Sequence, residues 1–431
     1  MIKIRIDLKT KLFYGMGVSY AIVDQIFVQW VLYFYLPPAS LGLKPMLTPI
    51  LISIALSFSR FVDVITDPLV GYLSDKFNSK WGRRVPFIAL GTIPLSLTTI
   101  AFFYPPNTGE VGNFIYLLIV GSLFFTFYTV VGGPYNSLIP EIGINKEEQL
   151  SLSTWQSVFR LLYSAIAMIA PGILIKYFGK GDSLLGIREM VIFLSIISFL
   201  GSCFTIFGVK EKKYASVKKV SVDFKAAIKL LIKDINFIYY LLGLLMFFVG
   251  FNSIRATMNY YIEEIMGYTT VEITISSALL FLVSALFFYP VSKLCKKIGY
   301  RKVMLISLFL ICVLTITMFF IGKSIEPKYG FVIFALLGVP VSGAAFILPP
   351  AMLSDISRRI SEESGENIEG ICFGIQGFFL KMAFFLSILV LPVLLSYGNN
   401  GVVGKFGIYL TTIFSTLTFM LGIFFYWKYK E

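Results

Sequence analysis

Twelve long runs of apolar residues, separated by short polar breaks, occupy most of this 431-residue chain. A helix needs about 20 consecutive apolar residues to cross the hydrocarbon core of a bilayer. Lipid offers no partners to backbone N–H and C=O groups, so spans of this length must be helices rather than barrel strands. The sequence therefore predicts an all-α membrane protein with twelve transmembrane helices, expected at residues 12–36, 46–73, 86–104, 114–138, 151–175, 189–208, 236–262, 270–291, 303–322, 330–352, 370–396 and 406–427.

The composition excludes several classes of protein. Hydrophobic residues make up 57% of the chain and charged residues 14%, against about 45–50% and 25% in soluble domains. A soluble enzyme, a disordered chain and a secreted disulfide scaffold are therefore excluded. The chain has no histidine, its four cysteines show no paired spacing, and it contains no GxxxxGK[ST] string. We expect no cofactor other than a coupling ion, no nucleic-acid partner and a monomer in the lipid bilayer.

Basic residues are unevenly distributed among the polar breaks. Most of the 37 Lys and Arg residues lie in the two terminal segments and in the breaks after even-numbered spans, and the formal net charge is +13. Loops rich in Lys and Arg stay on the cytoplasmic side of a membrane. We therefore predict a multi-pass protein of the cell membrane (inner or plasma) with both termini in the cytoplasm. The opening MIKIRIDLKTKL has no features of a cleaved signal peptide.

The longest polar break lies in the middle of the chain and divides the spans into two groups of six. We predict an N-terminal six-helix bundle at 1–208, a basic cytoplasmic linker at 209–235 and a C-terminal six-helix bundle at 236–431. In the second half of the linker the apolar residues share one helical face and the lysines lie on the opposite face. This pattern predicts an amphipathic helix on the inner membrane surface. A plain solvated linker is the alternative. Two six-helix halves are typical of secondary transporters.

The second span carries three charged residues in an apolar run. Arg60, Asp63 and Asp67 are spaced i, i+3 and i+7 and share one helix face. Ionised groups at membrane depth cost at least a few kcal/mol each and usually mark ion or substrate paths. Two carboxylates one turn apart repel each other, and a bound Na⁺ or a proton relieves the repulsion. The pattern predicts a cation site, and an internal ion pair that only joins helices is the alternative.

A second charged group follows at the end of this span. Asp75 closes the span, and Arg83 and Arg84 precede the third. A carboxylate facing a short basic turn can form ion pairs in one state of a gate and break them in the other. We predict a gating role for these three residues, with simple anchoring by positive charge as the alternative.

Longer strings resemble a known family of transporters. They are RFVDVITDPLVGYLSDKFNSKWGRRVPFI, LFYGMG, YTVVGGPYNSLIPEI, AMLSDIS and GICFGIQGFFLKM. Together they are similar to the glycoside–pentoside–hexuronide:cation symporters of the major facilitator superfamily, whose best-known type is the melibiose permease. The resemblance covers all twelve spans and implies the major facilitator fold.

The resemblance also implies roles for single residues. The family's cation-site carboxylates fall on Asp63 and Asp67, and its cation-site threonine falls on Thr129. The residue before the second carboxylate is Asn in the melibiose permease and Thr66 here, which leaves Na⁺ and H⁺ both open as the coupling ion. If sodium is the ion, the two carboxylates are its metal ligands.

A lysine of span 11 also matches the family. It falls on Lys381, a single charge in the apolar run GFFLKMAFFLSI. We expect it to act either as a counter-ion in a charge network with Arg60 and the two carboxylates, or as a ligand of an anionic substrate.

The sugar pocket of the melibiose permease is not reproduced. Its span 4 Asp and Trp correspond to Gly132 and Asn136, so galactosides are not predicted. The residues alone suggest another pocket for a polyol, formed by Asp24, Asn136, Trp155 and Gln156, because carboxylates and amides bond hydroxyls and aromatic faces stack on sugars. Contacts between helices for the amides and an interfacial anchor for the tryptophan are the alternatives.

Four functions compete. The leading hypothesis is a symporter coupled to Na⁺ or H⁺ that moves a small polar solute, such as a sugar, glycoside or hexuronide, by alternating access. A lysolipid or amphiphile symporter of the same superfamily is the nearest alternative. A membrane-embedded transferase is a more distant alternative, because it would need a base and metal ligands clustered at one membrane face and the sequence offers only scattered loop acids. A scaffold without transport activity is equally distant, because intramembrane charge would then have no use. We therefore predict that the protein is not an enzyme.

Overall fold

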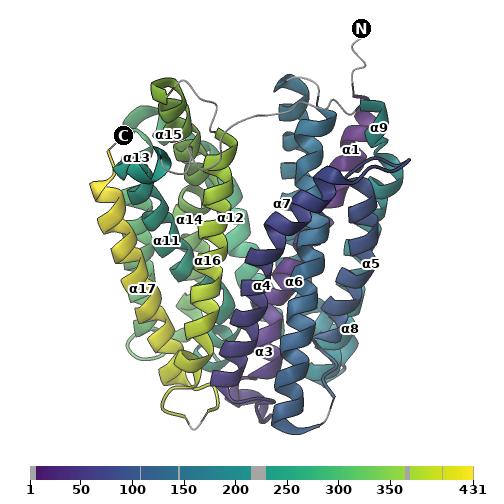
Figure 1. Ribbon diagram of the computed structural model, residues 1–431. Coiled ribbons are helices and arrows are strands. Elements are labelled where there is room, and N and C mark those ends of the chain that lie inside the picture. Colours follow the sequence, from purple (N-terminus) through teal and green to yellow (C-terminus); the bar gives the residue numbers. More distant parts are fainter. Residues whose placement is uncertain are drawn as a thin grey trace. The chain divides into compact units, whose positions relative to one another are not determined.

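The computed structural model describes residues 6–106, 108–143, 146–214, 230–364, 369–399 and 401–430. Among these residues all regular elements are helical, apart from three isolated backbone bridges. The predicted all-α fold is confirmed. The chain divides into two compact units (Figure 1): unit 1 comprises Met1–Leu36 and Met46–Lys219, and unit 2 comprises Pro37–Pro45 and Val220–Glu431.

Unit 1 contains the first six expected spans. Its first span is built of short pieces, in which a 3₁₀ turn and a π-helical turn interrupt the α-helix. The elements of this unit are α1 (Leu8–Met16), η1 (Gly17–Tyr20), α2 (Ala21–Ile26), η2 (Phe27–Val31), α3 (Leu32–Tyr35), α4 (Pro49–Lys76), α5 (Val85–Ala101), α6 (Gly109–Ile142), α7 (Lys146–Gly179), α8 (Ser183–Gly208) and α9 (Glu211–Tyr214).

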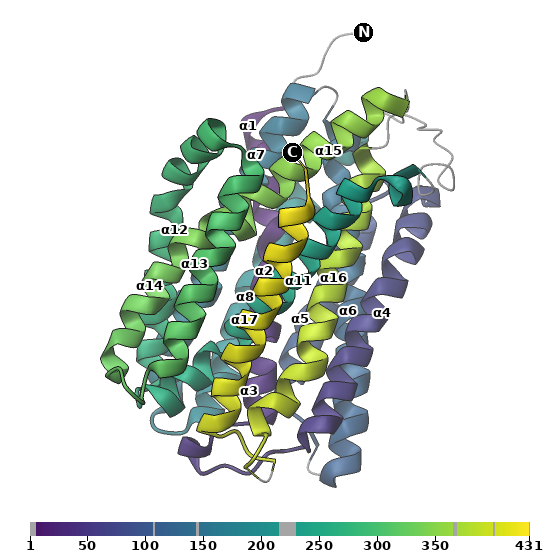
Figure 2. The ribbon, with the colours of Figure 1, turned by 90° about the vertical axis from the view of Figure 1, so that its left-hand side faces the viewer.

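Unit 2 contains the remaining spans, seen from another side in Figure 2. Two of its spans also include a π-helical segment. The elements of this unit are η3 (Ala39–Leu41), α11 (Ile235–Tyr260), η4 (Tyr261–Ile265), α12 (Thr270–Ile298), α13 (Tyr300–Phe320), η5 (Pro327–Tyr329), α14 (Gly330–Val341), η6 (Ser342–Ile347), α15 (Leu348–Ser364), α16 (Glu369–Ser396) and α17 (Lys405–Lys428).

The helices agree closely with the expected spans. Within the described residues, eleven helices are long and apolar enough to cross a membrane. The span expected at 86–104 corresponds to α5, a shorter apolar helix of 17 residues. The amphipathic helix expected in the linker falls largely on residues 215–229, which lie outside the described residues.

The segment between the first two spans groups with unit 2. Within that unit Pro38 forms a backbone bridge with Val403, and the N–H of Ser40 donates to Oε1 of Glu264 over 2.5 Å. Nothing in the local sequence between the spans indicates these pairings. The predicted boundaries at residues 208 and 236 stay a prediction.

Helix α4 has two chemically different faces. Ile54, Phe58, Phe61 and Ile65 are exposed at helical spacing on one face. The opposite face is buried and carries the polar residues Ser59, Arg60 and Asp63, and α4 packs closely on α6. An exposed apolar face beside a buried polar one is suited to lipid outside and to polar contacts within the unit.

We predict that Gly186→Ala destabilises the protein, because α7 and α8 approach each other closely at this glycine. A Cβ on Gly186 would collide with the backbone carbonyl of Ile175. Overpacking of this kind costs about 1–3 kcal/mol. Thermal unfolding of the purified variant should show a lower midpoint than the wild type.

Gly133→Ala in α6 is the matched control, because a Cβ there meets nothing within 4 Å. This variant should unfold at or above the wild-type temperature, since alanine stabilises a helix by about 0.5–1 kcal/mol over glycine. Equal midpoints for the two variants would contradict the close approach.

Candidate functional site

A buried carboxylate lies at the centre of the candidate cation site. The side chain of Asp63 in α4 is 0% exposed. One turn earlier, Nη1 of Arg60 donates to Oδ2 of Asp63 over 3.0 Å. From α6, the hydroxyl of Thr129 donates to Oδ1 over 2.7 Å. Each oxygen of Asp63 therefore has a donor, which a carboxylate removed from water requires.

The same threonine also reaches the second carboxylate. Its Oγ1 lies 3.0 Å from Oδ1 of Asp67, and Asp67 is exposed, unlike Asp63. A hydroxyl has only one proton to donate, so it can serve one of these two carboxylates at a time. Oδ1 of Asp63, Oγ1 of Thr129 and Oδ1 of Asp67 thus form a cluster of three oxygens, open on the side of Asp67, where a cation or a second proton would relieve repulsion.

Thr66 has a different contact from Thr129. Its hydroxyl donates to the backbone oxygen of Asp63 over 3.2 Å, a bond within its own helix. The roles of Thr66, Asp63, Asp67 and Thr129 in cation binding stay predictions.

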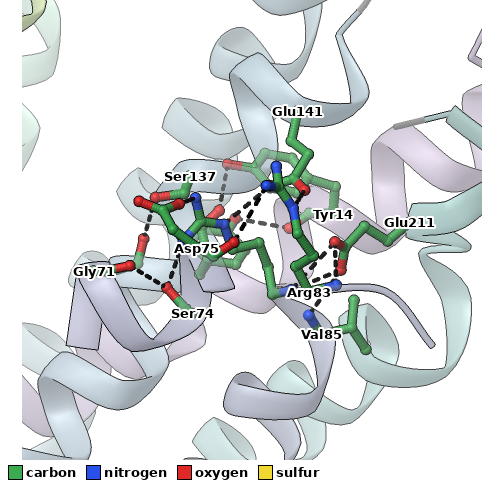
Figure 3. A network of polar contacts seen from close by, with 12 residues as sticks. Tyr14, Gly71, Ser74, Asp75, Arg83, Val85, Ser137, Glu141 and Glu211 are labelled. Atoms are coloured by element: carbon green, nitrogen blue, oxygen red, sulfur yellow. Dashed lines mark hydrogen bonds and ion pairs between the residues drawn. The ribbon is translucent and has the colours of Figure 1, made fainter. Parts of the chain in front are cut away.

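The charged loop between α4 and α5 forms a second polar network, shown in Figure 3. Arg84 pairs with Asp75 through Nη2, and its Nε lies 3.0 Å from Oε2 of Glu141. Nε of Arg83 lies 2.7 Å from the other oxygen of Glu141, and its Nη1 reaches the backbone oxygen of Asp75 at 3.5 Å. The three residues expected to form the gate are brought together, and the buried carboxylate of Glu141 in α6 joins the two arginines.

A second glutamate holds the backbone of this loop. The carboxylate of Glu211 in α9 accepts hydrogen bonds from the backbone N–H of Arg83 (2.6 Å), Arg84 (2.9 Å) and Val85 (2.9 Å). These groups lie at the start of α5, where backbone N–H groups have no partner within the helix. Burial raises the pKa of the Glu211 carboxyl, and the three backbone donors lower it in part.

Gly82 makes room for this contact. Its φ is +118°, and a Cβ on it would collide with the carboxylate of Glu211. The turn is closed by a pair of 3.2 Å backbone hydrogen bonds between Ser79 and Gly82. A side chain at position 82 would therefore both strain the turn and displace Glu211.

Sequence reasoning missed both glutamates. Glu141 is the second-last residue of the string YTVVGGPYNSLIPEI, and Glu211 stands in the basic string VKEKK. A single acid at the end of an apolar span, or within a run of lysines, is a weak signal of a contact with a distant loop.

The residues proposed for a substrate pocket are partly brought together. Nε2 of Gln156 donates to Oδ1 of Asn136 over 2.8 Å, and Nδ2 of Asn136 lies 3.4 Å from the hydroxyl of Tyr20. Nη2 of Arg160 lies 3.3 Å from the same hydroxyl. Tyr20, in the 3₁₀ turn η1, is a further member of this group that sequence reasoning missed, because tyrosines are common in apolar spans.

The remaining residues proposed for the pocket are Asp24, Trp155 and Lys381. Asp24 of α2 is half-buried and interacts electrostatically with Arg160. Trp155 is half-buried, and its ring lies 6.4 Å from that of Phe159. Lys381 belongs to α16 in unit 2 and is half-buried there.

The chain matches the model of a family described as MFS/sugar transport protein over residues 13–430. It belongs to this family. The resemblance seen in the sequence and the expected major facilitator fold are thereby confirmed, and the chain is a multi-pass membrane protein.

Three curated relatives are similar over most of the chain. Identity to the inner membrane symporter YicJ of Escherichia coli (strain K12) is 25% over 410 residues, covering 91% of this chain and 84% of that protein. The isoprimeverose transporter of Lactiplantibacillus pentosus is 24% identical, with coverages of 79% and 71%. The sodium-dependent lysophosphatidylcholine symporter 1-A of Danio rerio is 22% identical, with coverages of 82% and 72%.

A solved structure shares the fold. A D-xylose–proton symporter aligns with a TM-score of 0.70 at 12% identity, covering 98% of this chain and 95% of that chain. At this identity the comparison concerns the fold alone.

We predict that Asp75→Asn lowers the rate of transport more than it lowers substrate affinity, because a gate contact acts in only one conformational state. The side chain of Asp75 is 60% exposed, so its pair with Arg84 should be worth about 0.5–1 kcal/mol, and the rate should fall roughly two- to five-fold. The rate is measured by uptake into proteoliposomes and affinity by equilibrium binding.

Glu326→Gln is the control for this experiment, since it removes an exposed ion pair with Lys328 far along the sequence. It should leave both quantities unchanged. A loss of affinity without a change in rate for Asp75→Asn would count against the gate.

Proposed function

We propose that the protein is a symporter that uses a gradient of Na⁺ or H⁺ to move a sugar or glycoside across the cell membrane. The observation that carries the proposal is the cluster of three oxygens formed by Asp63, Asp67 and Thr129 on two packed helices of a transporter family. The description of the family model and the name of the isoprimeverose transporter support a sugar as the solute. The names of two relatives support symport.

The cluster suits a coupling cation on chemical grounds. Carboxylate and hydroxyl oxygens are the ligands that hard cations take in proteins. Arg60 already compensates part of the charge of Asp63, while Asp67 adds a second negative charge at membrane depth. A bound cation or a proton between the two carboxylates lowers the cost of both.

The polar group around Tyr20 is our candidate for the substrate pocket. Asn136 and Arg160 bring an amide and a guanidinium group to 3.4 and 3.3 Å from its hydroxyl, and Gln156 joins the group through its 2.8 Å hydrogen bond to Asn136. Groups of this kind donate to and accept from sugar hydroxyls. Trp155, which precedes Gln156 in the chain, and the acid Asp24 would add a stacking face and a strong acceptor.

A second candidate substrate is a lysolipid, favoured by the name of the Danio rerio relative. The two substrates can be separated by uptake into proteoliposomes under an imposed Na⁺ or pH gradient. Accumulation of a pentose, hexose or glycoside without uptake of lysophosphatidylcholine supports the sugar, and the reverse result supports the lipid.

We also propose that both termini are cytoplasmic and that the protein works as a monomer.

We predict that Asp67→Asn abolishes uphill accumulation of substrate, because it removes one carboxylate of the proposed cation site. Asp63→Asn should do the same, although it also removes the ion pair with Arg60. Exchange of substrate across the membrane should survive in Asp67→Asn, since exchange does not draw on the ion gradient. The measurement is the steady-state ratio of internal to external substrate.

Thr129 offers a matched pair of variants for the same site. Thr129→Val removes one of the three oxygens with little change of shape and should lower Na⁺ affinity by about ten-fold or more, since a polar contact with a charged group is worth about 1.5–3 kcal/mol. Thr129→Ser keeps the hydroxyl and should stay close to the wild type. Normal accumulation by Asp67→Asn and Thr129→Val together would place the cation site elsewhere.

We predict that Lys381→Ala weakens the mutual enhancement of cation and substrate binding. Lys381 is a single ammonium in an apolar helix, where an ionised group is costly to retain without a use. If its charge balances the cation-site carboxylates when no ion is bound, each ligand favours the other by the same factor. The enhancement is measured by titrating one ligand at several concentrations of the other, and an unchanged factor would assign Lys381 a structural role.

A further inference from the structure

A pocket of about 480 Å³ lies at the end of α8, beside the turn between α4 and α5 and the short helix α9. This volume falls within the range of roughly 300–1,000 Å³ of small-molecule sites. Every residue that lines it belongs to unit 1. The pocket is open to its surroundings, and it is distinct from the cation cluster, because none of its lining residues belongs to α4 or α6.

Four lysines line this pocket, namely Lys80, Lys210, Lys212 and Lys213. All four are exposed. In the described part of the chain, Lys80, Lys210 and Lys212 form no ion pair. The pocket therefore offers several ammonium groups to an anion.

The single acid of the pocket binds backbone N–H groups and not these lysines. The carboxylate of Glu211 is turned toward the backbone N–H groups of Arg83, Arg84 and Val85, and it is buried. Because that carboxylate already occupies the start of α5, an incoming anion would be held by the lysine side chains rather than by the helix terminus.

The remaining residues that line the pocket are apolar, and the two aromatic ones among them are exposed. Trp81, at the tip of the turn, is 51% exposed, and Phe207, in the last turn of α8, is 78% exposed. Phe207 marks the point where a membrane-spanning helix ends. Tryptophan is enriched at the boundary between lipid and water, where one part of a site is apolar and the other is wet.

We propose that this pocket binds the headgroup of an anionic phospholipid from the leaflet in which α8 ends. The lysines attract the phosphate, and the acyl chains lie along Phe207 and Trp81. Basic pockets beside transmembrane helices are suited to such headgroups, because each lysine near the surface adds attraction for anionic lipid. A soluble anion would leave the two exposed aromatic side chains without a partner.

Binding would also reinforce the loop that carries Arg83 and Arg84. A phosphate between Lys80 and the lysines of α9 joins the same two segments that the Glu211 carboxylate joins through backbone N–H groups. The lipid would therefore stabilise the arrangement of the charged loop seen here, independently of the identity of the transported solute.

The test uses the full protein in phosphatidylcholine nanodiscs that contain increasing fractions of a brominated lipid. Bromine quenches nearby tryptophan fluorescence, and subtracting the signal of Trp81→Phe isolates Trp81 from the other tryptophans of the chain, which has 4. Half-quenching should occur at a fraction of brominated phosphatidylglycerol at least about five-fold lower than that of brominated phosphatidylcholine, because each lysine near the surface adds about 1 kcal/mol of attraction.

Three double variants make the result specific. Lys80→Gln with Lys212→Gln should lower the preference for phosphatidylglycerol several-fold, because two of the four lysines remain, whereas Lys80→Arg with Lys212→Arg should keep it in full. Lys296→Gln with Lys297→Gln, at the exposed end of α12, removes the same charge elsewhere and should also keep the preference.

Several results would overturn the proposal. Equal quenching by the two brominated lipids in the wild type would mean that the pocket meets lipid without selecting it. Loss of the preference in the α12 variant would assign it to net charge rather than to the pocket. Removal of the preference by millimolar inorganic phosphate or glycerol phosphate, at constant ionic strength, would mean that the site takes a soluble anion.

Discussion

The carboxylate of Asp63 has no contact with solvent, and the surrounding structure of unit 1 satisfies its charge. Arg60 supplies a cation from the same helix, and Thr129 supplies a hydroxyl from α6. The contact with Thr129 requires α4 and α6 to pack face to face at this level. The exposed apolar residues of α4 lie on the other side of the helix, so the contacts of one buried carboxylate also determine which face of α4 is left exposed and apolar.

The loop that follows α4 is also held by buried carboxylates. Two buried glutamates from distant parts of the chain divide its donors between them, since Glu141 takes the side chains of Arg83 and Arg84 and Glu211 takes backbone N–H groups. With its backbone held by Glu211, the tight turn at Gly82 presents Lys80 and Trp81 outward. The gate residues and the proposed lipid site are thus two faces of one short loop.

Much of this could be predicted from the sequence, for identifiable reasons. The helices follow from the length of the apolar runs, and the grouping of Arg60, Asp63 and Asp67 follows from spacing within one helix. Thr129 came from the family resemblance. Glu141, Glu211 and Tyr20 could not be found in this way, because their partners are many residues distant and depend on how the helices pack. The sequence also did not predict the 3₁₀ and π turns of the first span, because the apolar pattern of this span is continuous.

The charges of the cation cluster have a simple consequence for coupling in the proposed mechanism. Arg60, Asp63 and Asp67 together carry one net negative charge when both carboxylates are ionised. One monovalent cation neutralises that charge, and so does one ammonium group, but the two together leave an excess positive charge at membrane depth. An ammonium that balances the cluster in the absence of the ion must therefore be released when the ion binds. Such an exchange links ion binding to the position of a lysine, which is the property that the proposed role of Lys381 requires.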